Sequence, residues 1–143
     1  MEERSLEEVV ADIDMLSKKI ATKQGEIVEA AKANPETLSI SLLQLARYNS
    51  ALGKHAAYAK YIARNTDRAA RRFRAETTLT LSKTQAVNKA ELQSEIDSAK
   101  LFRVASDAQL IADEADDLTY RTDTFLKMAQ SRLSLIKGDI QRG

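Results

Sequence analysis

The stretch that decides the fold runs from Leu38 to Phe73 and reads LSISLLQLARYNSALGKHAAYAKYIARNTDRAARRF. Apolar and small residues recur in it at alternating steps of four and three, which is the spacing of a coiled-coil seam over five heptads. The seam consists of Leu38, Leu42, Leu45, Asn49, Leu52, Ala56, Ala59, Ala63, Thr66, Ala70 and Phe73. We therefore predict one long helix over about 38–82, with a bend or a close contact at Gly53.

Two further helices are predicted outward from this stretch. A lead-in helix over about 5–33 begins at the capping box of Ser5 and Glu8 and ends at the Asn34-Pro35 break. Residues 83–98 are expected to form a connector, with a short helix over 85–93 capped by Thr84. A last helix over about 98–140 carries the seam Leu101, Val104, Ala108, Ile111, Ala115, Leu118, Thr122, Phe125, Ala129, Leu133, Ile136 and Ile140.

The composition favours long helices in a single helical domain, 1–143. The chain has 143 residues, four Gly, one Pro, no Cys and 30% charged residues. The two long helices would each extend roughly 60 Å at 1.5 Å per residue, and the connector favours an antiparallel hairpin. Because such a pair cannot bury both seams by itself, we expect an all-α, extended coiled-coil hairpin with an additional N-terminal helix that forms a homo-oligomer.

A stripe of cations on the long helix is the main candidate for function. Seven Lys or Arg residues and a single acid, Asp67, lie between positions 54 and 74, although the net charge of the chain is only +1. A cationic helix face suits a phosphate backbone, and the ring of Tyr61 between cations suits the unpaired bases of single-stranded DNA. The candidate nucleic-acid-binding residues are Lys54, Lys60, Tyr61, Arg64, Arg68, Arg71, Arg72 and Arg74.

An alternative is that the stripe forms interhelical salt bridges. The last helix carries Asp107, Asp113, Glu114, Asp116, Asp117 and Asp123. Folding the hairpin about residue 88 would bring residues 113–117 level with 60–64, and Asp107 level with Arg68 or Arg71. Lys54 and Arg72 project further from the seam and have no obvious partner. The two interpretations are not exclusive.

The rest of the sequence points away from catalysis. No Gly-rich phosphate loop, nucleophile elbow, zinc pattern or catalytic carboxylate pair is present, so neither an enzyme nor a metal or other cofactor is expected. The lone His55 is expected to be structural, and the acids at 113–117 to form a solvated face. Asn49 and Thr66 either are tolerated in the seam or specify its register. No apolar run approaches 18 residues, so no membrane span is expected.

The order of these features resembles a family of small helical bacteriophage proteins, the UvsY-like recombination mediators. The likeness covers about 38–141. It consists of a Tyr-containing long helix with a basic second half (residues 58–74), the connector that begins Ser82-Lys83-Thr84, and the final helix ending in Leu133-Ser-Leu-Ile-Lys-Gly-Asp-Ile140.

The resemblance implies a function and partners. It implies a ring-like or otherwise closed homo-oligomer that binds single-stranded DNA. It also implies loading of a RecA-type recombinase onto strands coated by single-strand-binding protein, in the cytoplasm of a bacterial host. The family's Lys and Arg contacts carry over to Lys54, Lys60, Arg64, Arg68, Arg71, Arg72 and Arg74. The alternative function is a non-enzymatic assembly or interaction protein, a phage structural factor or a host-protein adaptor, with no nucleic acid.

Overall fold

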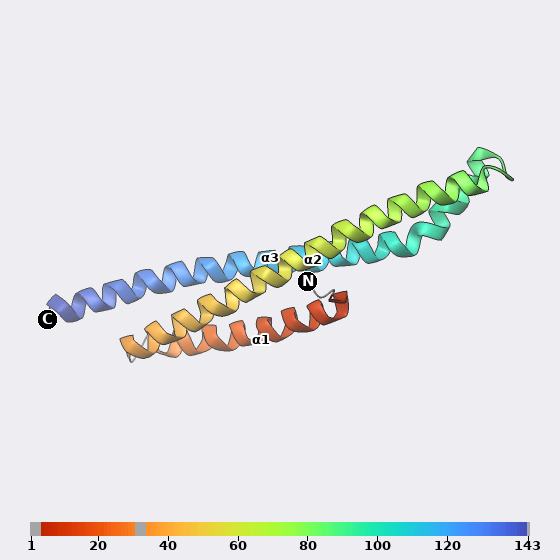
Figure 1. The fold of residues 1–143 in the computed structure, drawn as a ribbon. Coiled ribbons are helices and arrows are strands. Elements are labelled where there is room, and N and C mark those ends of the chain that lie inside the picture. The colour runs from red at the N-terminus through yellow and green to blue at the C-terminus, as the bar shows by residue number, and fades with distance from the viewer. Residues whose placement is uncertain (1–3, 31–33, 143) are drawn as a thin grey trace. The chain divides into compact units, whose positions relative to one another are not determined.

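The computed structural model describes residues 4–30 and 34–142, with side chains as far as residue 138. Three helices occupy almost all of these residues: α1 (Leu6–Ala30), α2 (Pro35–Leu81) and α3 (Val87–Arg142) (Figure 1). No strand occurs within the described ranges. The prediction of an all-α chain is therefore confirmed, and the predicted end of the first helix at residue 33 lies outside the described residues.

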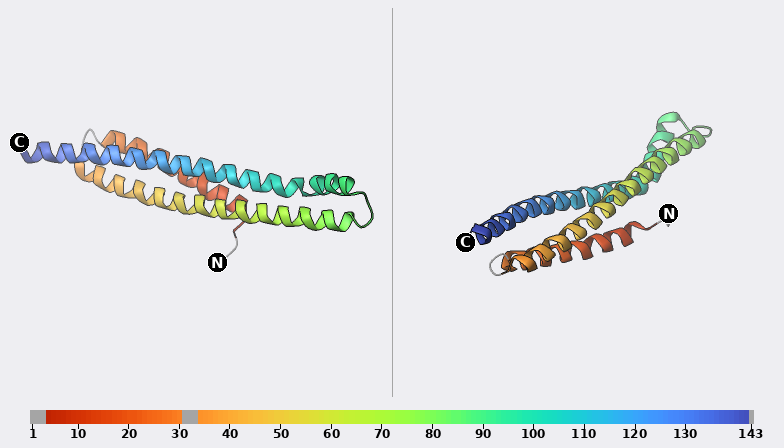
Figure 2. Two further views of the ribbon diagram at one scale, coloured as in Figure 1. Left: turned by 90° about the horizontal axis from the view of Figure 1, so that it is seen from above. Right: turned by 60° about the vertical axis from the view of Figure 1, so that its left-hand side comes forward.

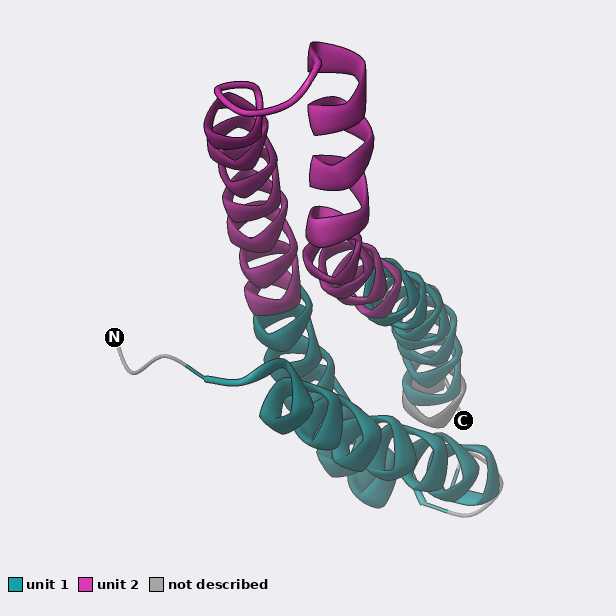
Figure 3. Ribbon diagram, turned by 90° about the vertical axis from the view of Figure 1, so that its right-hand side faces the viewer, with its two compact units in different colours: residues 1–56, 113–143 teal, residues 57–112 magenta. Residues whose placement is uncertain are grey.

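The chain divides into two compact units (Figure 3). Unit 1 contains residues 1–56 and 113–143, and unit 2 contains residues 57–112. The two units differ in net charge. Unit 2 carries ten Lys or Arg and six Asp or Glu, whereas unit 1 carries twelve and fifteen. The near-neutral chain is therefore the sum of a basic unit 2 of net charge +4 and an acidic unit 1 of net charge −3.

Side-chain caps set the beginnings of α1 and α2. The predicted cap of α1 is confirmed, because the Glu8 amide donates to Ser5 Oγ at 3.2 Å. Asn34 caps α2 in the same way, accepting the Glu36 amide on its Oδ1 at 3.0 Å. Helix α2 therefore begins at Pro35, three residues before the predicted start, because proline is well suited to the first position of a helix.

The connector between α2 and α3 is much shorter than predicted. Only residues 82–86 separate the two helices, so the expected connector over 83–98 and its separate short helix are wrong. Thr84 lies at the end of α2, where its hydroxyl donates to the Leu81 carbonyl at 3.3 Å. The polar residues after it continue α3, because the Ser94 and Ser98 hydroxyls bond carbonyls of their own helix and face inward. Such bonds often bend helices, and the α3 ribbon changes direction in this region (Figure 2).

The core of unit 1 is built from large aliphatic side chains. Helix α1 lies beside the first part of α2 (Figures 1 and 2). The large aliphatic residues that are buried are Val9, Ile13, Leu16, Ile20 and Ile27 from α1, Leu38, Leu42, Leu45 and Leu52 from α2, and Leu126 from α3. These side chains remove substantial apolar area from water, each worth about 1.5–3 kcal/mol when fully buried. Val28, which follows Ile27 on α1, is exposed.

The core of unit 2 is built only from small residues. Its two helix segments run antiparallel from the turn and are joined by a 2.7 Å hydrogen bond from Thr78 Oγ1 to Ser94 Oγ. Every buried described residue of unit 2 is Ala or Ser: Ala59, Ala63, Ala70, Ala90, Ser94, Ser98, Ala105, Ala108 and Ala112. Small residues let two backbones approach closely but contribute little hydrophobic area.

The seam of α3 differs from the predicted one at alternate steps. Ala108, Ala115 and Thr122 are buried as predicted. At the steps between them, Ala105, Ala112 and Leu126 are buried in place of Val104, Ile111 and Phe125, and Val104 is exposed. In unit 2 the small residue of each adjacent pair faces inward, because only a methyl group fits between closely packed helices.

Candidate nucleic-acid interface

The candidate interface is the cationic face of α2 in unit 2. A shallow hollow on this face is lined by Ala57, Lys60, Tyr61, Arg64, Asn65 and Arg68. Four of these six are candidates named from the sequence, and the structure brings them into one site. Arg64 and Arg68 are exposed, and Tyr61 exposes 52% of its surface. An exposed ring among cations can stack on a base while the cations contact phosphates.

A second tyrosine supports the exposed ring. The centroids of Tyr58 and Tyr61 lie 5.8 Å apart, with an angle of 41° between the ring planes. This tilted geometry is within the favourable range for aromatic pairs. Tyr58 is half-buried, so it braces Tyr61 from the α2 surface. The i, i+3 spacing of Tyr58 and Tyr61 is the signal in the sequence from which this pair could have been predicted.

Two of the candidate arginines are held by carboxylates. Arg71 Nε donates to Asp67 Oδ2 at 2.8 Å on the same helix, and Arg74 Nη2 donates to Glu95 Oε1 on α3 at 2.5 Å. Arg71 and Arg74 line a separate hollow together with Ala75, Thr78, Leu79, Glu91 and Phe102. Both ion pairs are exposed, so each contributes at most about 1 kcal/mol to folding.

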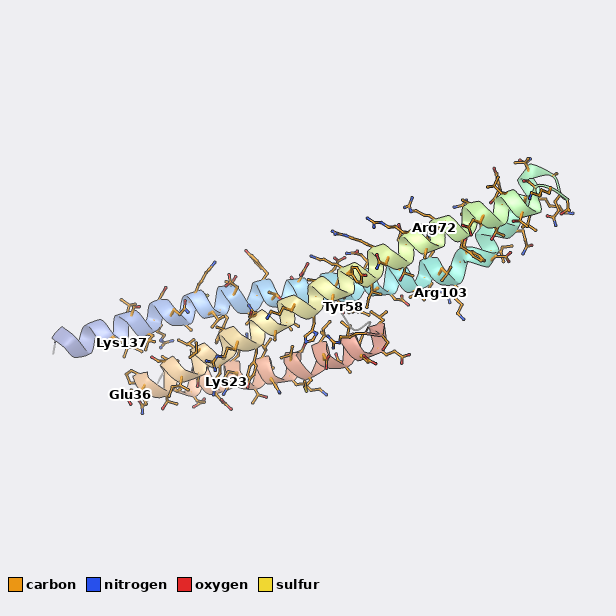
Figure 4. All side chains as sticks on the ribbon, viewed as in Figure 1. Lys23, Glu36, Tyr58, Arg72, Arg103 and Lys137 are labelled. Carbon is orange, nitrogen blue, oxygen red and sulfur yellow. The ribbon has the colours of Figure 1, made fainter. Side chains whose placement is uncertain are left out.

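The other arginines of the stripe differ from Arg71 and Arg74. Within the described residues of unit 2, Arg64, Arg68 and Arg72 form no ion pair. Arg72 projects from the outer side of α2, and Arg103 of α3 lies on the other side of unit 2 (Figure 4). The predicted pairing of Asp107 with Arg68 or Arg71 is wrong. The chain turns within 82–86 and not at 88, which shifts the level of Asp107 along α2 by about two helical turns.

Lys54 belongs to unit 1 and is separate from the hollow. Its side chain is exposed, and no ion pair involves it within the described part of the chain. The neighbouring His55 accepts a 2.9 Å hydrogen bond on Nδ1 from Arg4, which also pairs with Asp12. Burial, and then the charge of Arg4, lower the pKa of His55. Neutral His55 thus ties the start of the chain to α2, in agreement with a structural role.

The acidic residues of α3 in unit 1 include two pairs within that helix. Asp117 pairs with Arg121, and Asp123 with Lys127, both at 3.0 Å. The hydrogen bond to Asp123, together with its charge, raises the pKa of Lys127. No group of three or more His, Asp or Glu side chains among the described residues could hold a metal ion.

Two buried polar groups of unit 1 are incompletely satisfied. The Asn49 side-chain amide donates to the Thr119 carbonyl at 3.2 Å, but its Oδ1 has no hydrogen-bond partner among the described residues. Thr122 Oγ1 is also buried without such a partner. Asn49 therefore lies within the core, in the position where a polar group restricts register. Thr66, in contrast, is only half-buried.

Unit 1 has an apolar hollow of its own. Ile27 and Val28 of α1, Leu38 of α2, and Phe125, Met128, Ala129 and Arg132 of α3 line it. Within the described residues, no helix is both long and apolar enough for a bilayer span. Comparison with known proteins found no matching family model, no matching curated protein and no matching solved structure. Function is therefore inferred from the site itself.

Proposed function

We propose that this protein binds single-stranded DNA through the cationic face of α2. The observation that carries the proposal is the hollow around Tyr61, where an exposed ring and three cations meet on one helix face. Arg64 and Arg68 have no carboxylate partner within the described part of unit 2, so their charges are available to an anion. The net charge of +4 on unit 2 strengthens the local field.

The binding mechanism is electrostatic, with stacking as a second contribution. Lys60, Arg64 and Arg68 follow one another at four-residue steps, or about 6 Å along the helix axis. Cations in such a row replace the counterions along a phosphate backbone. A base of the strand stacks on Tyr61, which requires the base to be unpaired. Duplex DNA offers the same phosphates but no accessible base face, so it binds more weakly.

The biological role that we propose is recombination mediation. Copies of the chain pair through coiled-coil seams into a closed homo-oligomer, and the oligomer presents many cationic faces to one strand. It loads a RecA-type recombinase onto DNA coated by single-strand-binding protein. This part of the proposal rests on the resemblance to UvsY-like proteins, and a strand-exchange assay on coated DNA tests it. Stimulation above the rate of recombinase alone is the expected result.

The binding step is tested with a charge reversal on the stripe. Arg64→Glu with Arg68→Glu should abolish binding of a fluorescent oligonucleotide, measured by anisotropy at two salt concentrations. The wild-type affinity should fall with salt at a log–log slope of about −0.7 per phosphate contacted. Arg47→Glu with Lys137→Glu makes the same charge change on exposed positions of unit 1 and should leave tight binding.

Light scattering on the same variants separates the two interpretations of the stripe. The Arg64 and Arg68 variant should keep the wild-type assembly, because these side chains have no ion pair in unit 2. Loss of the assembly would show that the stripe is structural. Unchanged oligonucleotide binding by this variant would overturn the proposal.

A second candidate function is protein interaction without nucleic acid. It is favoured by the apolar hollow of unit 1 and by large exposed side chains such as Ile40, Leu43, Met128 and Leu135, which expose 56–70% of their surface. Exposed apolar groups of this kind mark interaction surfaces. A wild-type protein that assembles or captures a protein partner but binds no oligonucleotide at low salt would favour this function.

A further inference from the structure

Helix α3 carries a second stripe at coiled-coil spacing, centred on the side away from α2. Ser106, at the edge of this stripe, also lines a hollow with Arg64 and Asp67 of α2. The outer stripe consists of Leu92, Ile96, Ala99, Arg103, Ser106 and Leu110, at alternating steps of four and three. Leu92, Ile96 and Leu110 expose 59%, 62% and 58% of their surfaces. At 100° per residue these positions lie roughly opposite the buried seam of unit 2 on α3. The three large apolar side chains of the stripe are therefore left largely exposed by the packing of unit 2.

We propose that the outer stripe pairs with the outer stripe of a second copy, with the two α3 helices antiparallel about a two-fold axis. In this arrangement Leu92 packs against Leu110 of the second copy, and Ile96 packs beside Ser106. Ala99 lies opposite Arg103, where a methyl group leaves room for the longer side chain. A parallel pair would instead place Arg103 against its own copy in the centre of the interface, which like charges oppose.

The flanking charges favour a second copy as the occupant. On one flank of the stripe, between Ile96 and Leu110, the ionisable side chains are Lys100 and Asp107, which have opposite signs and are seven residues apart. Both are exposed, and neither has an ion pair within the described residues. Because helical side chains lean toward their own N-terminus, antiparallel copies bring Lys100 of one chain beside Asp107 of the other. The two-fold axis makes this pair twice.

The same charges select the register. Sliding the copies by one heptad in one direction places Lys100 beside Lys100, and sliding them in the other direction places Asp107 beside Asp107. Only the register that joins Leu92 to Leu110 makes both contacts attractive. On the opposite flank Glu95 is already held by Arg74, so it does not compete for Lys100. Lys100 and Asp107 both lie on α3 after Ser94 and Ser98 in the sequence.

This interface deepens the proposed function, because it names a surface through which the oligomer forms. Pairing through α3 leaves the Tyr61 hollow on α2 uncovered, so one particle can bind DNA through two cationic faces. The stripe spans residues 92–110, or about 27 Å of helix. Because two helices in contact over so short a length bury less area than a stable dimer usually does, self-association through this stripe alone should be weak and concentration-dependent.

The test is an exchange of the two charges. Lys100→Asp alone and Asp107→Lys alone each place like charges together and should weaken self-association by about five- to tenfold in sedimentation equilibrium. Mixing the two variants should restore association, because every flanking contact in the mixed pair is again attractive. The double variant should also associate as the wild type does. Lys83→Asp, in the turn and off the stripe, is the matched control.

The outcomes separate this inference from the proposed function. Failure of the mixture to associate more tightly than either variant alone would overturn the pairing. The variants retain Arg64, Arg68 and Tyr61, so each should still bind an oligonucleotide, with lower avidity than the wild type. If the Arg64→Glu, Arg68→Glu variant loses DNA binding while the Lys100 and Asp107 variants associate as expected, the proposed pairing of α3 helices is left intact. The Ile96→Ser variant removes an apolar contact without changing charge. It should also weaken self-association in sedimentation equilibrium.

Discussion

Arg74 on α2 and Glu95 on α3 form a 2.5 Å ion pair close to the turn between their helices. The pair joins the two helix segments of unit 2, and it also removes one cation from the stripe. An arginine that the sequence offered for DNA binding is thus engaged within the fold. Arg71 is likewise engaged within the fold, because it forms an ion pair with Asp67. Of the cations that line the Tyr61 hollow, Arg64 and Arg68 are therefore the two without an ion pair among the described residues.

Breaking the Arg74–Glu95 pair should strengthen DNA binding. Glu95→Gln removes the carboxylate that holds Arg74 and should raise the oligonucleotide affinity about twofold, while lowering the free energy of unfolding by less than about 1 kcal/mol. Anisotropy titration and urea denaturation measure the two effects. Glu91→Gln makes the same charge change without breaking an ion pair. An equal gain in both variants would mean that net charge, and not the release of Arg74, is responsible.

Tyr61 should contribute through its ring and not through its hydroxyl. Tyr61→Ala should weaken single-strand binding by about tenfold, since stacking on one base is worth about 1–3 kcal/mol. Tyr61→Phe keeps the ring and should bind nearly as well as the wild type. The affinity for duplex DNA, measured by competition, should be unchanged in both variants. A Phe variant as weak as the Ala variant would count against stacking.

Filling Gly53 should stabilise the protein. The expected close contact at this glycine is not observed among the described residues, because a Cβ added there would meet no side chain and no backbone of another helix within 4 Å. Gly53→Ala should therefore raise the free energy of unfolding by about 1 kcal/mol through helix propensity alone. Thermal or urea denaturation measures the change, with Gly25→Ala as a second open helical site. Destabilisation of the Gly53 variant would indicate that a second copy packs against this position.

Acid should loosen the contact between His55 and Arg4. Because the pKa of His55 is lowered in the folded protein, the unfolded chain takes up the proton first as pH falls. This contribution to stability is present above the ordinary histidine pKa of about 6.5 and is lost as pH falls below it. Melting curves at pH 7.5 and 5.5 should show a larger drop for the wild type than for His55→Gln. Equal drops would mean that carboxylates alone explain the pH dependence.

The helices of this chain follow from simple sequence rules. The apolar periodicity of α1 and α2, the Ser5 cap and the Asn34-Pro35 break were sufficient to place these two helices within a few residues. Heptad spacing predicted most of the buried positions of α2 between Leu38 and Ala70. It failed at Thr66, which is half-buried, and at Phe73, which is exposed, and it missed the buried Ser41. These features are local, so propensity and capping decide them.

The errors arose where packing overrode the residue type. Ser94 and Ser98 looked like connector residues, but their buried hydroxyls donate to carbonyls of their own helix, and Ser94 also accepts a hydrogen bond from Thr78. On α3, Ala105 displaced Val104 from the seam, because only a methyl group fits between closely packed helices. The early turn then moved the level of Asp107 against α2. The distance between two helices is set by their joint packing, and no single stretch of sequence contains it.

The methyl-lined core of unit 2 has a consequence for motion. Alanine and serine release little area to water when the two helices separate, whereas the Leu and Ile core of unit 1 releases much more. Opening of residues 57–112 should therefore need less energy, and backbone amides there should exchange with deuterium first. The segment that carries Tyr61 is then the one that can reshape itself around an irregular strand.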